Sequence, residues 1–254
     1  SRGRALGAFL AAVAGTAGGG DGGDGGDSEA RPAGLRVGVC GLLDTQNGSQ
    51  EDVVGGARAL AAAGFATIKV KVGRQVHPQM DADFLRAIRA AVGPAVALRC
   101  DANRAWALPD ALRFARAVED LGVEFLEEPV QDPRDLAAFH AGAAVPVALD
   151  ETLDDLALAA GAEADAGLAA AVDAAAVLVL KPSRLGLERA AELDAWGRRR
   201  GLRSVVSSAF ESAVGLGQLA EVAAFLDARP GGGPGARLDH GLGTGGWFRD
   251  GRDV

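Results

Sequence analysis

The sequence predicts an α/β fold with a parallel β-sheet, and it favours a (β/α) barrel over an open, doubly wound sheet. Short apolar runs alternate with helical patterns along most of the chain, which is typical of parallel strands joined by crossover helices. The alternation repeats about seven times, and so many repeats favour a closed barrel. Charged residues follow the apolar runs, at the strand ends where barrels carry their active sites.

The predicted strands are short runs with apolar centres. An eighth strand is harder to place, and we expect it within Arg237–Phe248. The first seven are Leu35–Leu43, Thr67–Val72, Val96–Asn103, Val123–Glu128, Val145–Asp150, Ala176–Lys181 and Arg203–Ser208.

The predicted helices occupy the intervals between these strands. Asp or Pro near the start and Gly near the end are the usual signals of a helix. The interval between the fifth and sixth strands is longer than expected. Five helical patterns are clear, at Met80–Val92, Leu108–Gly122, Arg134–Gly142, Gly186–Gly201 and Glu211–Ala228.

Composition excludes several classes of partner. The chain has 254 residues, a net charge of −8 and a pI near 5.0, which argues against a nucleic-acid or anionic-membrane partner. A small carboxylate substrate is compatible with this charge, because a cationic pocket can lie within an acidic surface. No apolar run approaches the roughly 20 residues that span a bilayer. Two cysteines, Cys40 and Cys100, suggest neither a disulfide framework nor a zinc site.

The chain divides into two expected parts. Residues 1–34 include the stretch "GGGDGGDGGDS" from Gly18 to Ser28, which cannot bury apolar surface. We interpret residues 1–34 as a flexible Gly/Asp-rich N-terminal segment. Residues 35–254 hold the predicted barrel and are the expected catalytic domain.

Five successive strands place charge at their C-terminal ends. A solvent-exposed strand end explains one such residue but not a series of them, so the series predicts a functional site. Ser207 and Ser208 add polar groups at the end of the seventh strand. The charged or amide residues are Lys69 and Lys71, Arg99, Asp101 and Asn103, Glu127 and Glu128, Asp150 and Glu151, and Lys181.

Three of these residues indicate a metal ion. Asp101, Glu127 and Asp150 supply one carboxylate from each of three neighbouring strands. Converging carboxylates repel one another unless a cation lies among them. Oxygen ligands without His or Cys favour Mg²⁺, with Mn²⁺ as a second candidate.

The lysines indicate the reaction. Lys69 and Lys71 approach the expected metal from one side, and Lys181 approaches from the other. A metal between opposed lysines suits the removal of a proton next to a carboxylate, because the metal and a cation stabilise the enediolate. A lysine acts as a base only if its pKa is lowered, and we expect Lys69 and the metal to do this for Lys71.

In this order, the motifs "KVKVG", "DAN", "EEP", "DE" and "KP" resemble the two-lysine branch of the enolase superfamily, which includes muconate-lactonizing enzymes. The resemblance covers roughly Leu35 to Phe225. Within the branch, "LRCDANRAW", "FLEEP", "LVLKPS" and "VVSSAFESAVGLGQLA" are most similar to the o-succinylbenzoate synthase family. This implies a modified TIM barrel of (β/α)7β type. It also implies a Mg²⁺-dependent hydro-lyase that converts 2-succinyl-6-hydroxy-2,4-cyclohexadiene-1-carboxylate to 2-succinylbenzoate for menaquinone or phylloquinone biosynthesis.

The resemblance also implies a role for each residue. Lys71 would take the α-proton and return it to the departing hydroxyl, and Lys181 would stabilise the enediolate from the opposite face as a cation. Asp101, Glu127 and Asp150 would bind the metal, and Glu127 is chosen over Glu128 because it shares a face with Val123 and Phe125. The expected substrate-binding residues are Lys69, Arg99, Asn103, Ser207 and Ser208, the serines by hydroxyl or backbone N–H. Glu128 and Glu151 would support the metal ligands.

The superfamily's N-terminal capping domain has no room before Leu35, so residues 1–34 are alternatively the remnant of that domain or the seam of a fusion. We therefore expect a barrel that largely lacks its cap, with fusion to other quinone-pathway domains as one arrangement. The expected location is the cytoplasm of a bacterium or the plastid of a photosynthetic eukaryote, and not outside the cell.

Other functions stay open. An N-acylamino acid racemase or a dipeptide epimerase of the same superfamily also opposes two lysines across a metal. A third hypothesis is a catalytically incompetent barrel fragment of a larger fusion protein. A Schiff-base aldolase using Lys181 would leave the carboxylates unexplained. The three histidines, His77, His140 and His240, are interpreted as surface residues.

Overall fold

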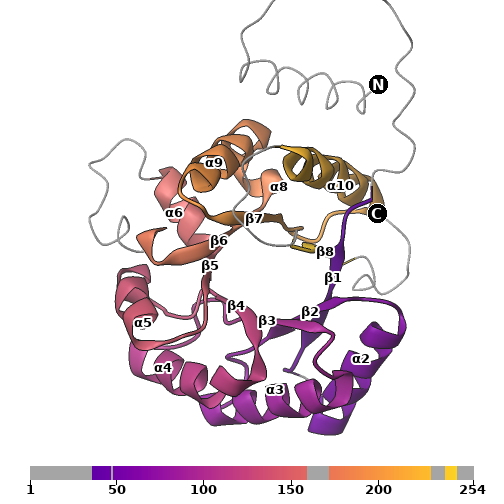
Figure 1. Ribbon diagram of the computed structural model, residues 1–254, viewed down its shortest axis with the longest axis vertical. Helices are drawn as coiled ribbons and strands as arrows, with labels where there is room; N and C mark the ends of the chain where they lie inside the picture. The colour runs from indigo at the N-terminus through magenta and orange to yellow at the C-terminus, as the bar shows by residue number, and fades with distance from the viewer. Residues whose placement is uncertain (1–35, 47, 159–171, 230–237, 245–254) are drawn as a thin grey trace, which may run out of the picture.

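Eight parallel strands form a nearly closed barrel in the computed structural model of the chain (Figure 1). The structure describes residues 36–46, 48–158, 172–229 and 238–244. Hydrogen-bonded neighbours follow the order β7-β6-β5-β4-β3-β2-β1-β8. A parallel bridge between Ser207 and Gly241 joins the two ends of this sheet, so the barrel closes between β7 and β8. The predicted fold class is confirmed. Residues 1–34, interpreted as a separate segment, lie outside the described residues.

The strands are the apolar runs that the sequence predicts, with small changes at their ends. The eighth strand lies within the predicted range Arg237–Phe248, and the first begins at Val39, later than predicted. The eight are β1 (Val39–Asp44), β2 (Thr67–Lys71), β3 (Ala97–Asp101), β4 (Val123–Glu127), β5 (Val147–Leu149), β6 (Ala175–Leu180), β7 (Arg203–Val206) and β8 (His240–Gly243).

Several predicted strands end too late. The structure ends β5 at Leu149, β6 at Leu180 and β7 at Val206, one or two residues before the predicted ends. Asp150 lies in a bend and Lys181 directly precedes a short helix, whereas Ser207 still pairs with Gly241 in a single bridge. Asp150 and Lys181 therefore lie at the rim of the barrel, just beyond its strands.

Helices surround the barrel (Figure 1). Ser49 and Asp52 form a capping box at the start of α2, and α3 begins with Pro78 and ends before Gly93, which has φ of 75°. Among the described helices, α2, α6 and α8 were not identified individually from the sequence. They are α2 (Gln50–Ala62), α3 (Pro78–Val92), α4 (Leu108–Ala117), α5 (Leu136–Gly142), α6 (Glu151–Leu158), α8 (Pro182–Leu185), α9 (Leu187–Arg199) and α10 (Ala213–Ala228), with short 3₁₀ turns at Glu119–Leu121 and Pro133–Asp135.

Apolar side chains fill both sides of the strands. The larger cluster packs the sheet against the helices. Successive side chains of a strand point to opposite faces of the sheet, and in a barrel both faces are packed. The smaller cluster fills the inside of the barrel and leaves the polar strand ends above it. Its buried members are Phe125, Ala148, Val177, Val179, Val205 and Leu238.

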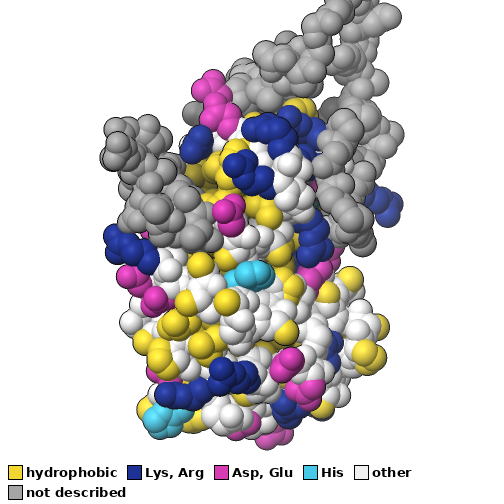
Figure 2. All heavy atoms as spheres, turned by 60° about the vertical axis from the view of Figure 1, so that its left-hand side comes forward, with side chains coloured by type: hydrophobic (Ala, Val, Ile, Leu, Met, Phe, Trp, Pro, Cys, Tyr) yellow, Lys and Arg dark blue, Asp and Glu magenta, His cyan; other side chains and the backbone are white. Residues whose placement is uncertain are grey.

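The outer surface is mixed in charge. Basic and acidic side chains are spread among apolar ones over the face shown in Figure 2. Among the described residues, no helix is long and apolar enough to cross a membrane.

His240 is not a surface residue, contrary to prediction. It lies on β8 and is 1% exposed. Its Nδ1 accepts the backbone N–H of Val206 on β7 at 2.9 Å, and its Nε2 lies 3.4 Å from Asp227 Oδ2 on α10. The side chain therefore joins β8 to β7 and α10 at the point where the barrel closes.

Candidate active site

The strand register brings the predicted site residues together at one end of the barrel. Lys71 pairs with Asp101, and Asp101 pairs with Glu127, so these three side chains lie at one level and on one face. Glu127 pairs with Ala148, and Asp150 lies two residues further along the same face. Because Phe125 and Ala148 on this face belong to the internal cluster, the face points into the barrel.

The three predicted metal ligands are deeply buried. Asp101 and Glu127 are 1% exposed and Asp150 is 3% exposed. A carboxylate is costly to bury without a positive partner. Each of them therefore needs a cation nearby, and the structure provides lysines.

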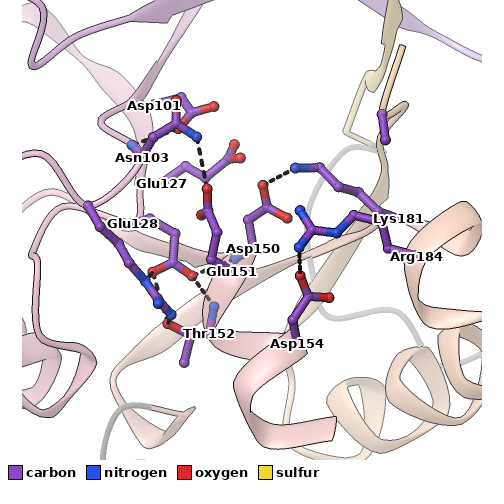
Figure 3. Close-up of polar contacts among 12 residues, drawn as sticks. Asp101, Asn103, Glu127, Glu128, Asp150, Glu151, Thr152, Asp154, Lys181 and Arg184 are labelled. Carbon is purple, nitrogen blue, oxygen red and sulfur yellow. Dashed lines mark hydrogen bonds and ion pairs between the residues drawn. The ribbon is translucent and has the colours of Figure 1, made fainter. Parts of the chain in front are cut away.

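Ammonium groups contact all three carboxylates. Lys69 Nζ lies 3.0 Å from both Asp101 Oδ2 and Glu127 Oε2, so it bridges them. Lys71 Nζ lies 2.6 Å from Asp101 Oδ2 and 2.7 Å from Asn103 Oδ1. Lys181 Nζ forms an ion pair with Asp150 Oδ2, as Figure 3 shows.

Burial and charge shift the pKa values in opposite directions. Burial alone would lower the pKa of Lys69, but Asp101 and Glu127 outweigh it and hold that pKa well above its usual value. Burial likewise opposes the effect of Asp150 on Lys181, whose pKa is also raised. Lys69 and Lys181 are therefore charged while they pair with these carboxylates.

The carboxylates also act on one another. Burial raises the pKa of Glu127 well above its usual value, and the nearby charge of Asp101 adds to this effect. Burial raises the pKa of Asp150, whereas Lys69 and Lys71 overcome burial at Asp101 and lower its pKa. The three groups thus repel one another, and a further positive charge among them would relieve that repulsion.

This donor set fits a hard divalent ion. All the donors are carboxylate oxygens from neighbouring strands, as Mg²⁺ prefers. Within the described ranges, no three His, Cys, Asp or Glu side chains have the geometry of a formed metal site. Lys69 bridges Asp101 and Glu127, and Lys181 pairs with Asp150, so the ammonium groups contact the same oxygens that a metal would use.

A cavity of about 280 Å³ opens above these groups. Lys69, Lys71 and Lys181 line it, whereas the three predicted metal ligands do not, so the ammonium groups lie between those ligands and the cavity. The other predicted residues in its lining are Asn103, Glu151, Ser207 and Ser208. Sequence reasoning missed further lining residues, among them Cys40, Leu42, Arg184, Phe210 and Thr244.

The chain has only three lysines, and all three line this cavity. Every other basic side chain, apart from histidine, is arginine. Arginine keeps its proton in proteins, whereas lysine can lose it and act as a base. The lysines, which are the basic side chains able to exchange a proton in this way, are therefore concentrated at this cavity.

Ser207 and Ser208 have fewer groups free to bind a ligand than the sequence predicts. The backbone N–H of Ser207 donates to Leu180 O at 2.8 Å, and that of Ser208 donates to Gly241 O at 3.0 Å. Both N–H groups are thus already used within the barrel. The Ser208 hydroxyl shares a hydrogen bond with Thr244 at 2.7 Å, which leaves the Ser207 hydroxyl as the better candidate ligand.

Arg99 lies deeper than a substrate ligand would. It is 2% exposed, and its Nε donates to Glu124 Oε2 at 2.6 Å. Its Nη1 donates to the carbonyl of Asp239 at 2.5 Å, and the guanidinium lies over the Phe125 ring, 4.8 Å from its centroid. Arg99 therefore joins β3, β4 and the start of β8, and any effect on a ligand in the cavity acts over a distance.

The two glutamates expected to support the metal ligands behave differently. Glu128 is fully buried, and its Oε1 accepts the backbone N–H groups of Asp150 at 2.8 Å and Thr152 at 2.7 Å. Glu151 Oε1 accepts from Asn103 Nδ2 at 3.0 Å (Figure 3). The Asn103 side chain in turn accepts a hydrogen bond from Lys71. Glu128 thus orders the backbone at Asp150, and Glu151 orients the amide beside Lys71.

Comparison with known proteins gives a consistent result. The family model described as enolase C-terminal domain-like matches residues 52–230. The chain is 36% identical over 226 residues to Protein PHYLLO, chloroplastic, from Arabidopsis thaliana, which covers 84% of this chain and 13% of that protein. It is 36% identical over 178 residues to an o-succinylbenzoate synthase from Thermobifida fusca, covering 68% of this chain and 52% of the relative.

A solved structure shows the same relation. The crystal structure of MenC from Desulfotalea psychrophila matches with a TM-score of 0.64 and 26% identity, covering 81% of this chain and 56% of that one. The chain thus spans about half the length of these two shorter relatives.

Proposed function

The chain belongs to the enolase C-terminal domain-like family, and from this premise we propose that it is the barrel of an o-succinylbenzoate synthase. The proposed reaction is the syn-dehydration of 2-succinyl-6-hydroxy-2,4-cyclohexadiene-1-carboxylate to 2-succinylbenzoate, in menaquinone or phylloquinone biosynthesis. The similarity to o-succinylbenzoate synthases and to a MenC structure supports this assignment.

One observation carries the proposal. Lys71 is the last residue of β2 and Lys181 follows β6, and three strands separate β2 from β6 in either direction around the barrel. Both lysines line the same cavity, so they face it from opposite sides, above the buried carboxylates. This arrangement suits a carbon acid that gives up a proton on one face and is stabilised on the other.

Members of the enolase superfamily use a divalent metal ion, usually Mg²⁺. We assign Mg²⁺ to Asp101, Glu127 and Asp150, with Mn²⁺ as a possible substitute, on the chemistry of the three buried oxygen donors. The ion would supply positive charge to the substrate carboxylate, which makes the neighbouring C–H more acidic.

In the proposed reaction, Lys71 transfers the proton and Lys181 supplies charge. Lys71 takes the proton from the ring carbon next to the carboxylate, and Lys181 holds its charge over the opposite face of the resulting enediolate. The C–O bond to the hydroxyl then breaks, and the same proton leaves from Lys71 with the hydroxyl as water. Loss of water makes the ring aromatic, so the first step is the harder one.

The substrate's carboxylates need partners as well. Lys69 contributes charge beside the metal ligands, and Asn103 positions Lys71 through the hydrogen bond between their side chains. The Ser207 hydroxyl is the candidate ligand for the succinyl carboxylate, since the Ser208 hydroxyl, which also lines the cavity, is already bonded to Thr244. Arg99 contributes its charge from within the barrel.

The same geometry also supports a racemase or epimerase, since two opposed lysines serve both reactions. The test supplies the cyclohexadiene carboxylate, an N-acylamino acid and a dipeptide to the full-length protein with Mg²⁺. Ultraviolet absorbance follows the aromatic product, and loss of optical rotation follows racemisation. Formation of 2-succinylbenzoate supports the proposal, and rotation loss without aromatic product would reject it in favour of the racemase.

The assignment of this chain to a larger protein is part of the proposal. Similarity to 13% of PHYLLO supports a module within a fusion of quinone-pathway domains. A barrel without activity in such a fusion is the remaining alternative. The intact set of lysines and carboxylates argues against it, because a scaffold does not need them.

A further inference from the structure

Arg104 lies in the turn after β3 with an unusual backbone conformation. Asn103 has φ of 44° and Arg104 has φ of 59°, and Glu128, after β4, also has φ of 44°. Left-handed values at residues other than glycine are uncommon and persist where the surrounding structure enforces them. The backbone N–H of Arg104 donates to the carbonyl of Glu128 at 2.8 Å, so the two turns are joined.

The guanidinium of Arg104 connects these turns to α6. Nε donates to Glu128 Oε2 at 3.1 Å. Nη2 donates to Thr152 Oγ1 at 2.9 Å and to Asp155 Oδ2 at 2.7 Å. Glu128 is fully buried and Arg104 is 22% exposed, so the arginine covers a carboxylate that has lost its water.

Glu128 extends this network to a metal ligand. Its Oε1 accepts the backbone N–H groups of Asp150 and Thr152, and its Oε2 accepts the Thr152 hydroxyl at 2.8 Å (Figure 3). Glu128 directly follows Glu127, and Arg104 lies in the turn that follows Asp101. One hydrogen-bonded network therefore holds together the ends of the three strands that carry the carboxylates.

We propose that Arg104 is a positioning residue for the metal site. Through Glu128 it fixes the relative placement of Asp101, Glu127 and Asp150. The inference rests on the proposed function, in which these three carboxylates hold the divalent ion. Residues that orient metal ligands without touching the metal typically change its affinity about 10–100-fold when they are lost.

Calorimetric titration of metal-free protein with MgCl₂ tests the inference without reference to turnover. The variants are Arg104→Met and Glu128→Gln. The matched controls are Arg198→Met and Asp194→Asn on α9, because Arg198 Nε lies 2.8 Å from Asp194 Oδ2 and that carboxylate is also fully buried. Urea denaturation of all four variants records their stability.

Arg104→Met is expected to weaken Mg²⁺ binding about 10–100-fold and Glu128→Gln about tenfold or more. The two control variants should lose stability but keep the wild-type Mg²⁺ affinity. Unchanged affinity in Arg104→Met overturns the inference, as does equal weakening in the controls. If Arg104→Met does not fold, Glu128→Gln decides in the same way.

The outcomes also separate this inference from the proposed function. A wild-type protein that binds no Mg²⁺ overturns the metal assignment and the inference together. A wild-type protein that binds Mg²⁺ but forms no 2-succinylbenzoate overturns only the proposed activity, and the affinities of the variants still decide the role of Arg104.

Discussion

At the scale of single residues, the site depends on the difference between a lysine that exchanges a proton and a lysine that only carries charge. Lys71 contacts Asp101 and Asn103, whereas Lys181 contacts Asp150 on the other side of the barrel. The dehydration uses Lys71 as base and acid, and it uses Lys181 only as a cation. A racemase needs proton exchange at both lysines.

Arginine substitutions separate these roles, because arginine keeps the charge but does not release its proton. Lys71→Arg should reduce kcat for dehydration at least about 100-fold, the contribution of a general acid–base residue. Lys181→Arg should retain clearly more activity than Lys71→Arg. Product absorbance measures both, with calorimetric Mg²⁺ binding as the control for an intact site. Equal loss of activity in the two variants would argue for proton exchange at both lysines.

The buried carboxyl group of Asp81 should make the stability of the folded chain depend on pH. It is fully buried in the first turn of α3, its Oδ2 has no hydrogen-bond partner among the described residues, and burial raises its pKa to about 6. Because the folded pKa exceeds the unfolded value, the stability from the neutral acid is complete below the unfolded pKa and disappears as pH rises through 6.

The shift from 3.8 to about 6 is worth about 3 kcal/mol of unfolding free energy. Asp81→Asn, which stays neutral, should match the wild type near pH 4 and be more stable at pH 8, by up to about 3 kcal/mol. Urea denaturation at the two pH values measures this. A variant that is less stable at pH 8 than at pH 4, relative to wild type, contradicts the prediction.

At the scale of elements, the seam between β7 and β8 is the weakest join of the barrel. Besides the bridge between Ser207 and Gly241, the seam holds the hydrogen bond from Val206 N–H to His240 and the one between the Ser208 and Thr244 hydroxyls. A small residue is needed on β8 at this seam, because a Cβ at Gly241 would lie 2.6 Å from Ser207 Oγ. The seam therefore depends on a close approach of strands and on one buried histidine.

His240→Leu should lower the unfolding free energy by about 1–3 kcal/mol, because the buried N–H of Val206 loses its acceptor. His240→Asn should recover part of this, since its side-chain oxygen can take the place of Nδ1. The exposed His140 gives the control, and His140→Leu should stay within about 0.5 kcal/mol of wild type. Urea denaturation that ranks His240→Asn below His240→Leu would contradict this role.

The sequence predicts the order of elements well because apolar runs and helix signals are local. It predicts strand ends poorly, since the last ladder bond depends on a neighbour that the pattern does not show. Asp150 and Lys181 were placed on strands for this reason, and they lie just beyond them. His240 was missed because a lone histidine in a Gly-rich stretch carries no periodic signal.

The sequence likewise predicts some features of the candidate site and misses others. Alternation along β3 predicts that Asp101 shares a face with Asn103, but it gives no distances. The bridging position of Lys69 and the deep contacts of Arg99 come from packing across the barrel, which no local pattern contains. Arg104 directly follows the "DAN" motif, so a role near the site could have been suspected from the sequence. Its partners Thr152 and Asp155 could not, because they lie about 50 residues further along the chain.

At the scale of the whole molecule, metal binding should couple to stability. A ligand that binds only the folded chain stabilises it by about 2.7 kcal/mol at 100 times its Kd. For a chain of this size that corresponds to a rise in Tm of roughly 5–10 °C. Thermal denaturation with Mg²⁺ against EDTA measures the shift, and Asp101→Asn combined with Asp150→Asn serves as the control that should lose it. An equal shift in wild type and control would place the ion elsewhere.

The most direct test of the central claim is a crystal structure of the full-length protein with Mg²⁺ and 2-succinylbenzoate. We predict oxygen atoms of Asp101, Glu127 and Asp150 at about 2.0–2.1 Å from the ion. We also predict the Nζ atoms of Lys71 and Lys181 on opposite faces of the product's ring. An ion held by other residues, or both lysines on one face of the ring, would contradict the account.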